Sequence, residues 1–386
     1  MESQIWSKKF QFVFLLLLYL SLTSCNKNIS SDLIVFDING NFPVKTLDIE
    51  DIADIEYLIL DISDDDFLFR SFSSMTDSFI ICRGDNEYLF FSRSTGKPVS
   101  KVNRLGQGPG EYTSVGPSVY SEINDELFIN SFFEIYVYTR DGTFKRKFPI
   151  GSVNTFFIGG LYDFDKEHLL IKVTSFIKGG MRDTSFMLVS KQNGFMDVIT
   201  IPIEEWISTV WVEGGGGGTL SDIYFAVRNG NDFLLTDYSS DTVYRFTPDR
   251  QLIPVLVRKP SIQKMETKIF LHGCLETGKY LFFSTQTRVD LNTSLKMAPH
   301  KGYLMDKNSR EFFQTYIKMR DYNGKELILN SSAINHCSNP QTGIIVLDAY
   351  ELQAANNEGK LSGKLKEATD RLSKDDEKIF MILHFK

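Results

Sequence analysis

The sequence predicts an all-β protein: a six-bladed β-propeller closed by an N-terminal strand, with a short helical insertion in its last blade. A hairpin pattern recurs five times along the chain at near-regular intervals, and further short apolar segments precede each hairpin. The composition agrees, because 13% of the 386 residues are aromatic and only 11 are proline.

Each copy of the repeat is an alternating strand, a tight polar turn and a second alternating strand. The five copies are Leu89–Val102, Ile135–Phe148, Phe186–Ile199, Val243–Leu256 and Tyr303–Tyr316. Three turns contain Gly96, Gly142 and Gly194, and the other two end at Arg250 and Arg310. Glycine supplies the positive φ angle that a two-residue hairpin turn needs. Successive turns lie 46, 52, 56 and 60 residues apart, and propeller blades repeat at roughly 40–50 residues.

Further strands are predicted ahead of each hairpin. The second strands are Ser78–Cys82, Glu126–Ile129, His168–Val173, Asp232–Thr236 and Lys279–Ser284. First strands such as Phe67–Ser73 and Ile223–Val227 complete sets of four. A four-stranded sheet cannot bury both faces alone, so we expect the blades to stack around an axis.

The C-terminal region predicts most of a sixth blade. Its strands are Ala333–Cys337, Gly343–Tyr350 and Lys378–Phe385, and Ile55–Asp61 is expected to supply the outer strand. Such closure removes the open sheet edge of the ring. An inserted helix is predicted at 360–373, because its apolar residues share one helical face.

The N-terminus carries an export signal. Lys8 and Lys9 precede an apolar run from Phe10 to Leu22, which is too short to span a bilayer. The run ends in Leu22-Thr23-Ser24-Cys25, which resembles the lipobox of bacterial lipoproteins, whose cysteine sulfur takes a diacylglycerol. The alternative is an ordinary secretory signal with a chance cysteine. We therefore predict a signal peptide at 1–24, a lipidated tether at 25–32 and a propeller domain at 33–386.

Charge and cysteine content narrow the function classes. Without residues 1–24, the net charge of −7 becomes −8, which disfavours nucleic-acid binding. Cys82, Cys274 and Cys337 are widely spaced, so a cysteine zinc site is not expected. They are interpreted as core residues, although one disulfide of undetermined pairing stays open.

The chain resembles the six-bladed β-propeller lipoproteins of Bacteroidetes, which have a TolB-like or NHL-like fold. The resemblance covers the whole mature chain and rests on the lipobox, the early strand IEYLILD, the closing strand IFMILHFK and the segment Gly106–Tyr112 (GQGPGEY). It implies the fold and an envelope location, most simply the outer membrane. It does not imply a function, because propellers serve many.

The segment GQGPGEY is one candidate binding surface. Its three glycines allow tight turns and close approach, and it lacks the features of a phosphate loop. Arg104, Glu111 and Tyr112 are candidate ligand-binding residues, and the alternative is a structural turn. Trp211 is a further candidate, because it precedes Gly214–Gly218, a predicted mobile loop, and could stack on a sugar or peptide.

Asn130, Asp237 and Asp348 each follow a second-strand apolar run. Ring symmetry could turn these oxygen ligands toward one axis, where they would suit Ca²⁺. The alternative is that each satisfies the turn after its strand. The five histidines form no HxH or HExxH pair, and no GxSxG motif is present.

Two function classes follow. The first is a non-enzymatic binding or scaffold propeller with a protein, peptide or glycan partner. The second is a Ca²⁺-dependent hydrolase or lyase with its site at the central channel, which would need converging oxygen ligands and a base. Asn26-Lys27-Asn28 lacks an acidic stretch after Cys25, which favours the periplasmic side over the cell surface.

Overall fold

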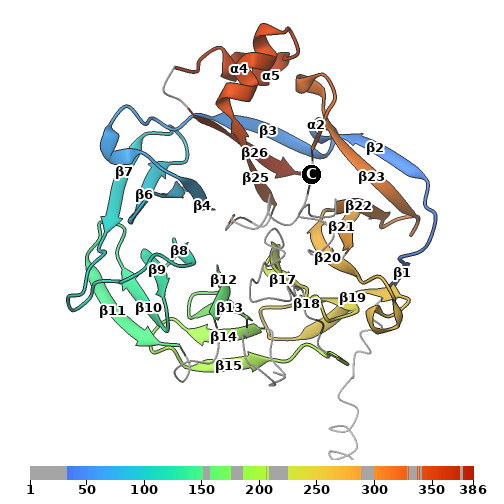
Figure 1. Cartoon of the computed structure of the whole chain (residues 1–386), viewed down its shortest axis with the longest axis horizontal. Helices are drawn as coiled ribbons and strands as arrows, with labels where there is room; N and C mark the ends of the chain where they lie inside the picture. The colour runs from blue at the N-terminus through green and yellow to red at the C-terminus, as the bar shows by residue number, and fades with distance from the viewer. Residues whose placement is uncertain are drawn as a thin grey trace, which may run out of the picture.

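The computed structural model describes residues 33–150, 157–174, 186–205, 207, 225–287, 300–327, 329, 337, 339, 341–373 and 377–386. In this part of the chain the strands form six sheets arranged in a ring (Figure 1). Five sheets contain four consecutive antiparallel strands, and the sixth contains three. The predicted all-β propeller is therefore confirmed.

Each of the five full blades runs from a first strand near the ring axis to a fourth strand at the rim (Figure 1). Blade 1 consists of β4 (Ser71–Met75), β5 (Phe79–Arg83), β6 (Glu87–Ser92) and β7 (Pro98–Asn103). Blade 2 consists of β8 (Ser118–Ser121), β9 (Glu126–Ser131), β10 (Glu134–Tyr138) and β11 (Phe144–Pro149). Blade 3 consists of β12 (Phe157–Asp163), β13 (His168–Thr174), β14 (Phe186–Ser190) and β15 (Met196–Ile199).

The two remaining full blades follow the same order. Blade 4 consists of β16 (Ala226–Asn229), β17 (Asp232–Leu235), β18 (Thr242–Phe246) and β19 (Leu252–Lys259). Blade 5 consists of β20 (Ile269–Glu276), β21 (Tyr280–Thr287), β22 (His300–Asp306) and β23 (Phe312–Met319). Short elements connect or flank the strands: the 3₁₀ helices η1 (Asp65–Phe67), η2 (Ile262–Lys264) and η3 (Arg320–Tyr322), and strand β24 (Lys325–Leu327).

The five predicted hairpins are the third and fourth strands of these blades. In each, a five-residue loop joins the strands, longer than the two-residue turn expected from the glycines. The predicted turn residue has a positive φ in every blade: +71° at Gly96, +84° at Gly142, +74° at Gly194, +63° at Arg250 and +62° at Arg310. The repeat is thus one backbone conformation, which arginine adopts where glycine is absent.

The sixth sheet closes the ring. It contains β25 (Thr342–Asp348), β26 (Lys378–Phe385) and, at its edge, β3 (Ala53–Leu58). Antiparallel pairing joins Phe385 to Ala53 and Phe380 to Leu58, so the predicted N-terminal closing strand is confirmed. Of the predicted strand Ala333–Cys337, only Cys337 lies within the described residues, and it bridges to Met75 of β4.

Two further N-terminal strands lie along the rim. β1 (Ile34–Asp37) adds in parallel to β19, and β2 (Val44–Asp48) adds in parallel to β23. The short helix α2 (Ile49–Ile52) then leads into β3. The segment from β1 to β3 therefore covers the outer edges of blades 4, 5 and 6 in turn (Figure 1).

The predicted helical insertion is two helices, α4 (Ala349–Asn357) and α5 (Gly363–Thr369), on the outer side of the sixth sheet (Figure 1). The predicted apolar face of 360–373 is confirmed, because Leu361, Leu365 and Ala368 are buried. The strand predicted to reach Tyr350 instead ends at Asp348, whose side chain accepts a hydrogen bond from Glu351 N–H and caps α4. Among the described residues, no helix is both long and apolar enough to cross a membrane.

An ion pair holds the seam between the closing strand and blade 1. Both guanidinium nitrogens Nη1 and Nη2 of Arg93 donate to the Glu56 carboxylate at 2.8 Å. The Arg93 hydrogen bonds hold the pKa of Glu56 below its ordinary value. His384 Nε2 lies 3.7 Å from the same carboxylate.

We expect Arg93→Met to lower the free energy of unfolding by about 1 to 2 kcal/mol near pH 7. A carboxylate with a lowered pKa stabilises the fold above its ordinary pKa, and this contribution is lost as pH falls through the folded-state pKa. The difference between wild type and Arg93→Met should therefore shrink below about pH 4, the ordinary range of glutamate. Chemical denaturation of both proteins at pH 7, 5 and 3.5 measures this difference.

Arg70→Met is the matched control. Arg70 makes the same two-pronged contact with Asp85, but the two side chains are 74% and 67% exposed. Such surface pairs contribute at most about 1 kcal/mol. Equal losses for Arg93→Met and Arg70→Met at every pH would show that Arg93 does not hold the seam.

Candidate functional site

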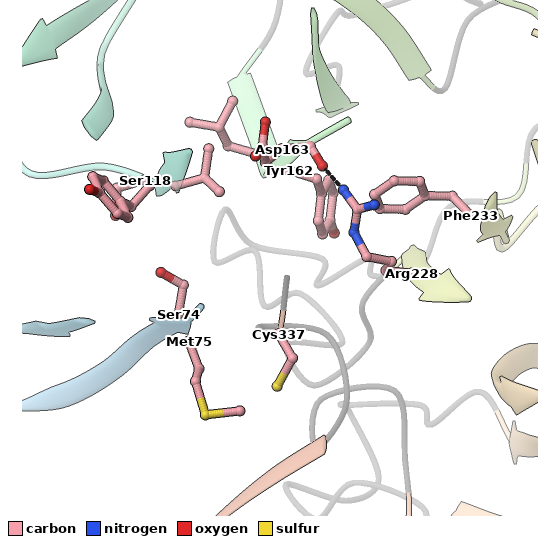
Figure 2. A pocket seen from close by; sticks show the side chains of 11 residues that line it. Ser74, Met75, Ser118, Tyr162, Asp163, Arg228, Phe233 and Cys337 are labelled. Carbon is pink, nitrogen blue, oxygen red and sulfur yellow. Dashed lines mark hydrogen bonds between the residues drawn. The ribbon is translucent and has the colours of Figure 1, made fainter. Parts of the chain in front are cut away.

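A small cavity, with about 40 Å³ accessible to water and partly open to solvent, lies inside the ring. The first strands β4, β8, β12 and β16 of four successive blades supply most of its wall (Figure 2). The lining residues are Ser74, Met75, Ser118, Val119, Tyr120, Leu161, Tyr162, Asp163, Arg228, Phe233 and Cys337.

Blades 1 and 2 contribute hydroxyl groups. A register shift between Phe72 and Ser74 interrupts the pairing of β4 with β5, and such bulges redirect side chains. Ser74 is 7% exposed, and its Oγ has no hydrogen-bond partner among the described residues. Ser118 is half-buried, and its Oγ lies 3.1 Å from Ser73 Oγ.

Blade 3 contributes an aromatic ring and a carboxylate. A Cβ atom at Gly160 would lie 2.6 Å from the Tyr162 hydroxyl, so glycine makes room for the Tyr162 ring. The next residue, Asp163, is the last of β12, and its Oδ1 lies 2.6 Å from Lys191 Nζ. Lys191 is itself buried and also donates to Ser121 Oγ and the Asp165 carbonyl. Lys191 therefore balances the charge of Asp163.

Blade 4 contributes a cation. Arg228 pairs across the sheet with Phe233, and its guanidinium carbon lies 4.6 Å from the centre of that ring. Arg228 Nη2 donates to the backbone carbonyls of Asp163 and Phe164 (Figure 2 shows the contact with Asp163). Burial lowers the pKa of Arg228, and the negative charge of Asp163 opposes part of this decrease. Within the described residues, no carboxylate lies within ion-pair distance of Arg228, and Asp163, whose charge acts on it, is itself paired with Lys191.

The predicted binding segment GQGPGEY lies away from this cavity wall, between blades 1 and 2. Glu111 folds back onto its own loop, where Oε2 accepts a hydrogen bond from Gly108 N–H at 2.8 Å. Tyr112 is fully buried, and its hydroxyl donates to the Asn86 carbonyl at 2.7 Å. Exposed Arg104 donates from Nε to the Gly142 carbonyl at 2.9 Å. These contacts join the loop to both blades.

The three predicted Ca²⁺ ligands lie in three different blades, and each has a partner within the protein. Asn130 Nδ2 donates to the Phe132 carbonyl in blade 2. Asp237, after β17, pairs with Lys172 of blade 3, and Asp348 pairs with Lys378 and caps α4 on the outer side of the ring. In the described ranges, no three His, Cys, Asp or Glu side chains gather as a metal site would require.

Cys25, the tether and Trp211 with its glycine run lie outside the described residues. Cys82 and Cys337 are buried free thiols, as expected of core cysteines. Cys274 lies in β20.

Sequence reasoning did not identify the cavity residues. Ser74, Asp163 and Arg228 lie in three different blades, and only the closed ring brings them to one space. One signal was present, since Arg228 directly follows the predicted first strand Ile223–Val227. A charged residue in an inner strand is a candidate for the channel lining.

A family model described as a 6-bladed beta-propeller matches residues 24–337. The chain belongs to this family, DUF5128. Among solved structures, a protein from Bacteroides fragilis described as exported is similar over 92% of this chain and 99% of its own, at 14% identity and a TM-score of 0.61. A DUF4221 family member from Bacteroides vulgatus covers 87% of this chain and 97% of its own, at 9% identity and a TM-score of 0.48. At these identities the likeness to the first structure concerns the fold. No curated protein matches the sequence.

Proposed function

We propose that this DUF5128 propeller is a non-enzymatic binding module of the bacterial cell envelope, with a small ligand or the end of a larger one in the ring cavity. The observation that carries the proposal is Arg228, which makes no ion pair among the described residues and lines a cavity whose other residues, apart from Asp163, are hydroxyl, aromatic, apolar and thiol side chains. A concave site with a few polar groups among apolar ones is typical of ligand binding.

The reactive groups of the lining support binding rather than catalysis. Burial raises the pKa of the Cys337 thiol, which disfavours the nucleophilic thiolate. Burial and the neighbouring Asp125 raise the pKa of Tyr120. Asp163 is paired with Lys191, so it is a poor general base.

The envelope location belongs to the same proposal. The apolar run before Cys25 and the lipobox support export and lipid attachment, most simply at the periplasmic side of the outer membrane. The similar Bacteroides fragilis protein is described as exported. Kinship with TolB-like or NHL-like propellers is proposed on the strand and turn pattern.

Lipid attachment is tested directly in cells. We expect an alkyne-labelled fatty acid to label the wild-type protein and not Cys25→Ser, because the thiol is the acceptor. Comparable expression of both proteins is checked by immunoblot. Equal labelling of the two would refute lipidation at Cys25.

The cavity is tested by blocking it. Ser118→Trp places a bulky ring in the cavity wall, and Ser94→Trp makes the same change on an exposed hairpin loop of blade 1. Full-length protein in detergent is screened by thermal shift against neutral saccharides, acidic saccharides, short peptides and organic acids. Hits are then measured by calorimetry on all three proteins, each first shown to be folded.

We expect a ligand that binds wild type and Ser94→Trp equally and loses at least tenfold in affinity with Ser118→Trp. Unchanged binding to a folded Ser118→Trp would place the site elsewhere. The absence of any ligand in the screen would also count against the proposal.

A further inference from the structure

We propose that the ring cavity recognises a sugar acid, whose carboxylate binds Arg228 and whose hydroxyl groups meet the serine side of the cavity. This inference rests on the proposed function and names its ligand class. Three observations support it: the N–H groups of Arg228 that make no hydrogen bond, the Ser74 hydroxyl without a hydrogen-bond partner, and the charges of the residues that line the cavity.

Arg228 has hydrogen-bond donors to spare. A guanidinium carries five N–H donors and no acceptor. Only Nη2 makes hydrogen bonds, both to backbone carbonyls, whereas Nε and Nη1 donate to no residue in the described part of the chain. Neither is among the buried atoms without a partner, so both have access to open space. These donors suit an anionic oxygen that enters the cavity.

Ser74 supplies a second, independent observation. Its hydroxyl is more than nine-tenths buried, lines the cavity and makes no hydrogen bond to any described residue. A buried hydroxyl without a partner is unfavourable, and a ligand oxygen would satisfy it. Figure 2 shows Ser74 and Arg228 on opposite walls, so a ligand that meets both needs polar groups at both ends.

The charge of the wall favours a monoanion. Asp163 and Arg228 are the charged lining residues, and Lys191 balances Asp163 from behind. The net charge is therefore about one positive unit, which a carboxylate matches. A phosphate dianion would bring its second charge close to Asp163, at a cost in a partly desolvated site. The Tyr162 ring can cover the apolar face of a sugar, and Ser74 and Ser118 can donate to or accept from its hydroxyls.

The test uses full-length protein in detergent and calorimetry with D-galacturonate and D-glucuronate. Matched ligands are the uronate methyl esters, neutral D-galactose and, as a peptide carboxyl group, N-acetyl-L-alanine. The variants are Arg228→Gln and Ser74→Ala, with Arg250→Gln as a control on an exposed hairpin loop of blade 4.

We expect one of the uronates to bind wild type and Arg250→Gln with equal affinity. The methyl ester and galactose should bind at least about tenfold more weakly, as should the uronate to Arg228→Gln. Ser74→Ala should weaken uronate binding about threefold or more. The ester comparison needs no variant, so it remains decisive if Arg228→Gln does not fold.

Three results would overturn the inference. Equal binding of the uronate and its ester would show that the carboxylate is not recognised, while the proposed binding of a ligand in the cavity would stand. Binding of N-acetyl-L-alanine but neither uronate would replace the sugar acid with a peptide carboxyl group. Failure of every probe to bind, together with a ligand from the screen that Ser118→Trp abolishes, would reject the sugar acid and keep the proposed function.

Discussion

Replacing Lys172 by methionine is expected to lower the free energy of unfolding by about 3 to 5 kcal/mol, the largest effect of any single substitution considered. Lys172 Nζ lies 2.6 Å from Asp237 Oδ2, and the two side chains are 6% and 4% exposed. The ammonium group also lies 4.5 Å from the centre of the Phe225 ring. Methionine removes the charge and leaves the Asp237 carboxylate buried between blades 3 and 4 without its cation.

Chemical denaturation of four proteins measures this effect: wild type, Lys172→Met, Asp237→Asn and the double variant. Asparagine can keep the hydrogen bond that Asp237 Oδ1 accepts from Ser239 N–H. The double variant should therefore be more stable than Lys172→Met, because no charge is left unpaired.

Lys147→Met is the matched control for Lys172→Met. Lys147 Nζ lies 2.9 Å from Glu134, but the pair is much more exposed. Its loss should cost at most about 1 kcal/mol. A Lys172→Met protein no less stable than Lys147→Met would show that the buried pair does not join the two blades.

Gly96→Ala is expected to cost about 2 to 5 kcal/mol. Gly96 has a φ of +71°, which is unfavourable for alanine. A Cβ atom there would also lie 2.2 Å from the Ile59 carbonyl oxygen, so the backbone after β3 must shift. The change therefore strains the seam at which the N-terminal strand meets blade 1.

Gly142→Ala separates the two causes. Gly142 occupies the same hairpin position in blade 2 with a φ of +84°, but its Cβ would meet its nearest neighbour at 3.8 Å. Gly142→Ala should therefore lower the free energy of unfolding only by the cost of a positive φ for alanine, about 1 to 2 kcal/mol. Thermal unfolding of both variants makes the comparison. Equal losses would mean that the contact between the hairpin and Ile59 adds nothing.

The parts of the fold that sequence reasoning predicted are those fixed by local chemistry. The five hairpins follow from alternation and from turn residues that adopt positive φ, as Gly96 and Arg250 do. The closing strand was predictable because the last blade lacked an outer strand and IEYLILD is apolar. These strands and turns could be predicted because they depend on residues that are close together in the sequence.

The unpredicted parts depend on distant partners. β1 and β2 pair in parallel with strands more than 200 residues away. Their short sequences, IVFD and VKTLD, do not indicate which strand each will pair with. α4 begins directly after an apolar strand, so the pattern of β25 concealed the boundary at Asp348. Its cap, an aspartate before a helix, was the available signal.

The cavity could not be predicted from the sequence either, because its residues are far apart along the chain. Ser74 and Arg228 are separated by three blade boundaries and share no sequence motif. The segment GQGPGEY, in contrast, is a recognisable motif, but its side chains make contacts within the protein. In a ring, residues become a site only after the ring closes. Motif reading alone therefore favours glycine-rich loops over an isolated charge in an inner strand.

A crystal structure of the full-length protein grown with a bound uronate tests the central claim most directly. We expect the carboxylate in the ring cavity, with an oxygen at about 2.7 to 3.2 Å from Nε or Nη1 of Arg228, and a ligand oxygen in hydrogen-bond reach of Ser74. An empty cavity with the ligand on the 106–112 loop or elsewhere on the rim would contradict the claim.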